Sequence, residues 1–132
     1  MVIYGEEIEN DMWFNLPLPP GINQTYKTNK NAAFYKSEKV KEWETEAGWI
    51  IKQQWKNTPA IKKNCRVYIN LFLTRDRDID STTKLVFDLL QRQRVIENDS
   101  LIVESTQEKH HIIKGETPDI KPHIDVMVEE VE

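Results

Sequence analysis

The clearest pattern of hydrophobic and polar residues lies in the second half of the chain. From Cys65 to Thr74, apolar residues fill every second position: Val67, Ile69, Leu71 and Leu73. Because successive side chains of a strand point to opposite faces, this alternation predicts a β-strand with one buried side. An apolar stripe at helical spacing follows, made of Leu85, Val86, Leu89 and Leu90. It predicts an α-helix that Asp80 or Ser81 can cap.

A second helix is predicted from Ser37 to about Asn57. Its apolar positions also recur at helical spacing, and they are Val40, Trp43, Ala47, Ile50, Ile51 and Trp55. The helix is expected to end at Thr58-Pro59, because the residue before a proline is pushed out of helical backbone. Trp49 lies off the stripe, which suits an edge of the core or a subunit interface.

Shorter strands are predicted on either side of these elements. Residues 1–10 are expected to be a frayed or edge segment, and Met12–Leu18 a first strand that Pro17 restricts to an edge or a strand end. The prolines of Pro19-Pro20-Gly21 force a turn, and residues 22–34 read as a polar loop. Leu101–Lys114 indicates one strand or two. The last strand is His123–Val131, with Ile124, Val126 and Val128 facing inward.

The predicted order is therefore β, α, β, α, β, β in one domain of 132 residues. It indicates an α/β (α+β) fold, a single-domain mixed β-sheet with helices packed on it. The single cysteine, Cys65, excludes an internal disulfide and a cysteine-based zinc site, and is expected to be buried or half-buried. No apolar run is long enough to span a membrane and no signal peptide is visible. A cytoplasmic protein without a membrane partner is expected.

The charge is unevenly distributed along the chain. The net charge is −4, but residues 24–66 carry ten Lys or Arg against four Glu. The alternative interpretations are a lysine-rich segment that only keeps the protein soluble and a phosphate-binding face.

Acidic residues crowd together where the central predicted strand ends. Asp78 and Asp80 are two residues apart, so in extended backbone both carboxylates point to one side. A divalent cation would relieve their repulsion, and carboxylates suit Mg²⁺ or Mn²⁺. The alternative is a solvated helix cap. A calcium-binding EF-hand loop is excluded, because Ser81 stands where the loop needs glycine and Phe87 where it needs glutamate.

A second motif interpretation starts from the same residues. Asp78-Ile79-Asp80-Ser81-Thr82 spells the Asp-x-Asp-x-Thr signature of haloacid-dehalogenase-like phosphatases. In that class the first Asp ends a buried strand near the start of the chain, whereas here polar residues precede it. The phosphatase is therefore kept only as a weaker alternative.

The ordered motifs together resemble the RusA family of Holliday-junction resolvases. Its Asp-x-Asp and following Lys correspond to Asp78, Asp80 and Lys84, its Phe-Asp-x-Leu helix to residues 86–90, and its later acidic pair to Asn98-Asp99. Its opening Pro-Pro-x-x-Asn element corresponds to residues 19–23, followed by Tyr26 and Lys27. Two positions depart from the pattern: Ser81 replaces the usual Asn, and Asn98 replaces one acid of the pair.

This resemblance implies a structure-selective endodeoxyribonuclease that needs Mg²⁺, which Mn²⁺ can replace, and no small-molecule cofactor. Asp78, Asp80 and Asp99 would hold the metal, and Lys84 would stabilise charge on the phosphate or position the attacking water. Asp88, Ser81 and Asn98 would support these ligands, Asp88 by orienting Lys84. The candidate DNA contacts are Asn23, Tyr26, Lys27, Lys30, Arg75 and Arg77.

The implied substrate is branched DNA, a four-way junction processed in recombination and repair, and the family association suggests phage or prophage DNA. Two symmetric cuts need two active sites, and this chain carries one copy of the motif, so a C₂ homodimer is expected. The other open interpretation is a module that binds branched DNA without cutting it.

Overall fold

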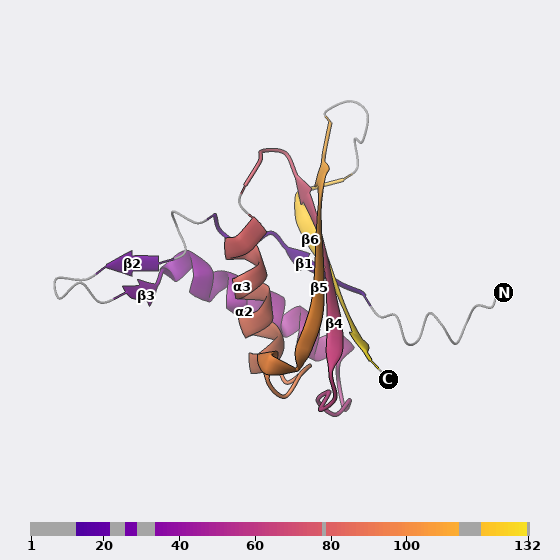
Figure 1. The fold of residues 1–132 in the computed structure, drawn as a ribbon. Helices are drawn as coiled ribbons and strands as arrows, with labels where there is room; N and C mark the ends of the chain where they lie inside the picture. The colour runs from indigo at the N-terminus through magenta and orange to yellow at the C-terminus, as the bar shows by residue number, and fades with distance from the viewer. Residues whose placement is uncertain (1–12, 22–25, 29–33, 78, 114–119, 132) are drawn as a thin grey trace.

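The fold is organised around β4 (Cys65–Leu73), an inner strand of a four-stranded sheet with the order β1-β6-β4-β5 (Figure 1). The computed structural model describes residues 13–21, 26–28, 34–77, 79–113 and 120–131, and of residues 26–28 and 34–36 only the backbone. β4 runs parallel to β5 (Ile102–His111) and antiparallel to β6 (His123–Glu130), which pairs in turn with β1 (Trp13–Pro17). The predicted single-domain α+β fold with a mixed sheet is confirmed.

Burial alternates along β4 as predicted. Cys65, Val67, Ile69, Leu71 and Leu73 are almost completely buried, while the residues between them are half-buried. The buried side faces both helices, α2 (Glu38–Gln54) and α3 (Ile79–Arg92), which cover one face of the sheet (Figure 1). The core also takes Ile124, Val126 and Val128 from β6, as predicted.

The helix α2 begins where the sequence predicted and ends slightly earlier. Ser37 is its N-cap, and the Ser37 Oγ accepts a hydrogen bond from the Val40 N–H at 3.3 Å. The helix ends at Gln54, three residues before Asn57, because Asn57 adopts a positive φ of 61° that a right-handed helix does not allow. Its buried residues include Val40, Trp43, Ala47 and Ile51, and Ile50 and Trp55 are half-buried.

Three sequence-based predictions need correction. The helix α3 starts at Ile79, so Asp80 and Ser81 lie in its first turn and are not its caps. For the same reason, the alternation of an extended chain does not reach Asp80. Residues 22–34 are not wholly loop, since β2 (Tyr26–Thr28) pairs with β3 (Phe34–Lys36) in a separate two-stranded sheet. Strands of three residues are too short to show an alternating pattern.

The C-terminal half resolves an ambiguity that the sequence left open. Residues 102–111 form one strand, β5, preceded by the 3₁₀ turn η2 (Asp99–Leu101). Before it, Val95 and Ile96 are fully buried, and Ile96 forms a parallel bridge with Ile61. As predicted, β1 is an edge strand that ends at Pro17. The expected frayed segment, residues 1–10, lies outside the described residues.

Candidate functional site

The connection from β4 to α3 carries the sequence-predicted acids. Thr74, Arg75 and Asp76 are exposed, and Arg77 is half-buried. Asp78, the first predicted metal ligand, lies outside the described residues. The parallel pairing of β4 with β5 requires a crossover, which α3 supplies by running back along the sheet.

The outer face of α3 brings two predicted residues together. Asp80 and Lys84 are both exposed and lie one turn apart, so their side chains share a face. Asp88, half-buried, is one further turn along, which places it next to Lys84 as expected. The opposite face of α3 is packed into the core by Thr82, Leu85, Val86, Leu89 and Leu90.

Asp99 is held at the other end of α3. The Asp99 N–H donates to Gln91 Oε1 at 2.9 Å, and Asn98 Oδ1 accepts from the Ser100 N–H at 2.8 Å. Asn98, the residue that replaces an acid of the family pattern, is therefore the N-cap of η2. Asp99 itself is exposed to solvent. Gln91 was not predicted as a functional residue. It could have been found from the sequence, because it lies three helical turns after Asp80 and therefore on the same face of the helix.

One chain does not bring Asp80 and Asp99 together. Asp80 lies near the end of β4, whereas Asp99 precedes Ile102, which pairs with Cys65 at the start of β4. Eleven residues separate Asp80 from Gln91, or about 16 Å along a helix axis. Two carboxylate oxygens on one Mg²⁺ lie only about 3 Å apart, given metal–oxygen distances of about 2.1 Å. Within the described residues, no three His, Cys, Asp or Glu side chains are grouped to hold a metal ion.

Asp76 is paired with a cation from β5. Lys109 Nζ lies 2.8 Å from Asp76 Oδ1, and this hydrogen bond and charge lower the pKa of the Asp76 carboxyl below its usual range. The sequence did not indicate this pair, because the two residues are brought together only by the parallel register of β4 and β5. Asp76 thus ties the loop before α3 to the edge strand.

Arg77 is engaged by the chain itself. Its Nη1 donates to the backbone carbonyl of Pro19, and burial lowers the pKa of the guanidinium. Arg75, the other arginine predicted to contact phosphate, is exposed. Of the remaining predicted DNA contacts, Asn23 and Lys30 lie outside the described residues. Tyr26 and Lys27 are in β2, where only the backbone is described.

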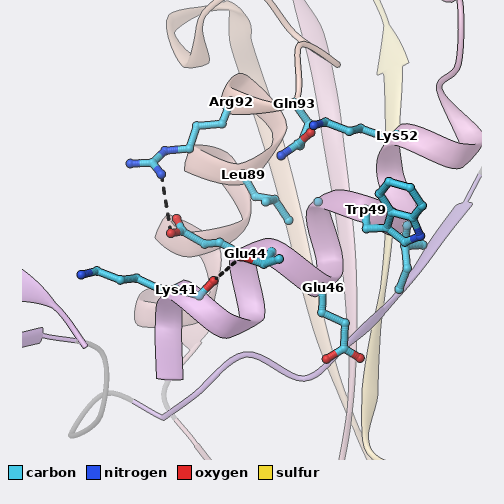
Figure 2. A pocket seen from close by; sticks show the side chains of 11 residues that line it. Lys41, Glu44, Glu46, Trp49, Lys52, Leu89, Arg92 and Gln93 are labelled. Atoms are coloured by element: carbon cyan, nitrogen blue, oxygen red, sulfur yellow. Dashed lines mark hydrogen bonds and ion pairs between the residues drawn. The ribbon is translucent and has the colours of Figure 1, made fainter. Parts of the chain in front are cut away.

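An open hollow of about 880 Å³ lies between α2 and α3 (Figure 2). Leu89 of α3 and Gln93, the residue after that helix, face Glu44 and Trp49 of α2 across it, and Arg92 Nη1 lies 3.6 Å from Glu44 Oε1. Trp49 is 64% exposed, in keeping with its place off the buried stripe. None of the predicted catalytic acids lines this hollow.

The face of the sheet that the helices leave open is acidic. Glu104, Glu108, Asp125 and Glu129 lie on it, and Arg66 sits between Glu104 and Glu129 with nitrogen–oxygen distances of 3.2 Å to each. The Phe72 ring stacks between His110 and His123, with ring centroids 4.8 and 4.5 Å away. His110 is exposed, and its ring takes part in this stack. Four carboxylates against one arginine make this face unsuited to phosphate.

Comparison with known proteins connects this arrangement with a family. The family model described as "Endodeoxyribonuclease RusA" matches residues 17–129. The chain is also 36% identical over 106 residues to "Crossover junction endodeoxyribonuclease RusA" of Aquifex aeolicus (strain VF5), which covers 79% of this chain and 81% of that protein. No helix in the described part of the chain is long and apolar enough to cross a membrane. From the family match and the relative, the chain belongs to the RusA family of endodeoxyribonucleases.

Proposed function

We propose that this protein is a divalent-metal-dependent endodeoxyribonuclease that resolves four-way DNA junctions by paired symmetric nicks. The observation that carries the proposal is the family match over residues 17–129. This range includes β4, the connection between β4 and α3 (here called the acidic loop), α3 itself and Asp99. The relative from Aquifex aeolicus is named for cleavage at crossover junctions. The phosphatase alternative is less favoured, because Thr82, the last residue of its signature, is buried in the core.

The residues present fit a magnesium site by their chemistry. Asp80 and Asp99 are exposed carboxylates, the donors that Mg²⁺ and Mn²⁺ prefer, and Asp78 would add a third. When bound, the metal supplies an acidified water and neutralises charge on the scissile phosphate. Lys84, one turn after Asp80, is placed to stabilise the negative charge that develops on the phosphate oxygens. Asp88, one turn further, would hold the Lys84 ammonium in position.

The separation of Asp80 from Asp99 is a second argument for the proposed homodimer, besides the need for two symmetric cuts. A two-fold axis perpendicular to α3 would place the first turn of one α3 beside the last turn of the other. Asp80 of one protomer and Asp99 of the second would then complete one site, and the same operation would complete the other. Each dimer would hold two sites, as two symmetric nicks require.

The distribution of charge favours one side of the molecule for DNA. The open sheet face carries four carboxylates, which would repel phosphates. The helix-covered side carries Asp80, Lys84 and Asp99, with Arg75 at the loop that leads into α3. We therefore place the junction against the helix side, where the metal site would lie.

The test is cleavage of a synthetic four-way junction, read as cut sites on a sequencing gel. The wild-type protein should cut in Mg²⁺ or Mn²⁺, and EDTA should stop it. Asp80→Asn should still bind the junction and lose cleavage. A variant that cuts at near wild-type rate would remove Asp80 from the site. Tight junction binding with no cleavage in either metal would favour the binding module instead.

A further inference from the structure

The short segment Pro17–Gly21, here called the strap, begins with the last residue of β1 and leaves the four-stranded sheet. Three of its five residues are prolines, which have no backbone N–H and so cannot continue a sheet ladder. Pro19 is nonetheless buried. A buried carbonyl group needs a hydrogen-bond donor, which can be a backbone N–H, a side chain or a water molecule.

Two side chains supply these donors. Trp43 Nε1 of α2 donates to the Pro17 carbonyl at 2.7 Å, and Arg77 Nη1 donates to the Pro19 carbonyl. The strap, Trp43 and Arg77 line a common hollow of about 360 Å³. Arg77 immediately precedes Asp78 in the sequence, so the second bond joins the strap directly to the acidic loop.

The surroundings of Arg77 differ from those of an arginine that is available to phosphate. It is half-buried, and none of the described carboxylates lies within ion-pair distance of it. Arg75, two residues earlier, is exposed and keeps its side chain in solvent. The two arginines that the sequence assigned to one task are therefore in different environments.

We propose that Arg77 is a positioning residue that fastens the strap to the loop carrying Asp78, and that Arg75 is the phosphate contact of the pair. This inference rests on the proposed nuclease function for its kinetic readout. Arg77 and Trp43 hold the strap at two points, one from the acidic loop and one from α2. Loss of either bond would let the strap shift against the loop, and a misplacement of about 1 Å can cost about 100-fold in rate.

The experiment compares Arg77→Ala, Trp43→Phe and Arg75→Ala in single-turnover junction cleavage, with binding measured over a series of salt concentrations. Arg77→Ala and Trp43→Phe should lower the cleavage rate by about 10- to 100-fold and leave the salt slope of binding unchanged. Arg75→Ala should weaken binding and reduce the slope by about one, because one phosphate contact is lost. If Arg77→Ala reduces the slope as Arg75→Ala does, Arg77 contacts phosphate and the inference is wrong.

A second measurement separates this inference from the proposed function. Hydrogen exchange of the peptide that covers the strap should speed up in Arg77→Ala and Trp43→Phe, whether or not the protein cuts DNA. Arg77→Lys keeps the charge with a single donor, so it should fall between wild type and Arg77→Ala, and it serves if the alanine variant does not fold. Unchanged hydrogen exchange in all three variants would show that Arg77 and Trp43 do not hold the strap, and would overturn the inference. A wild-type protein that does not cut junctions would overturn the function alone.

Discussion

Asp80 and Asp99 lie at opposite ends of α3, with Asp99 bonded through its backbone N–H to Gln91, three turns after Asp80 on the same helix face. The crossover from β4 to β5 imposes this separation, because α3 must span the length of the strand before the chain re-enters the sheet. If both acids bind one metal, they come from different protomers.

Mixed dimers test this arrangement. Asp80→Asn and Asp99→Asn should each be inactive alone, but co-expression should restore nicking. In a random mixture half of the dimers are mixed, and each holds one intact site, so about a quarter of the wild-type sites return. Mixed dimers would make single nicks and not paired cuts. Light scattering should report twice the 15.6 kDa chain mass. A mixture as inactive as its parts would show that each protomer builds its own site.

Gln91 is expected to act through Asp99. Gln91→Ala removes the acceptor of the Asp99 N–H, so η2 loses this hydrogen bond to α3. Because partners that orient a metal ligand are worth about 10- to 100-fold in metal affinity, the variant should need that much more Mg²⁺ for half-maximal cleavage. Gln93→Ala is the matched control. It lies two residues away and lines the hollow between α2 and α3, which neither Asp80 nor Asp99 lines. Equal effects of the two variants would point to general loosening of α3.

The sequence predicted the elements that bury an apolar face, since burial leaves a period in the residue pattern. The alternation of β4 and the helical stripe of α2 are confirmed, and so is the mixed sheet with helices on it. Elements without that period were missed. β2 and β3 have three residues each, and their pairing depends on the backbone.

The sequence indicated which residues are candidates for the site, but it did not predict how they are arranged in space. Neighbours on α3, such as Asp80 and Lys84, follow from helical spacing alone. Contacts between distant segments do not, and Asp76 with Lys109 and Arg77 with Pro19 depend on strand register and chain path. The assignment of Asp78, Asp80 and Asp99 as metal ligands stays a prediction.

Two buried hydroxyl groups, those of Thr82 and Ser37, should respond in opposite directions to removal. The Thr82 Oγ1 is fully buried and has no hydrogen-bond partner among the described atoms, so Thr82→Val should raise the free energy of unfolding by about 1 kcal/mol. The Ser37 Oγ caps α2, so Ser37→Ala should lower it by about 1 kcal/mol. Urea titration measures both. A destabilised Thr82→Val would mean that the hydroxyl is bonded in solution.

The ion pair between Asp76 and Lys109 should make part of the stability dependent on pH. Lys109 lowers the pKa of Asp76 in the folded protein, so the ionised carboxylate favours folding. This contribution is present above the ordinary aspartate pKa of about 3.9 and is lost as the pH falls through the lower value of the folded state. Asp76→Asn should therefore melt at a lower temperature than wild type at pH 7, and the difference should shrink on acidification below about pH 4. Lys109→Met should reproduce this dependence, because it removes the other charge of the pair. Thermal melts from pH 7 to about pH 2.5 measure the effect. A melting difference that stays constant over that range would show that Asp76 acts through a contact other than its charge.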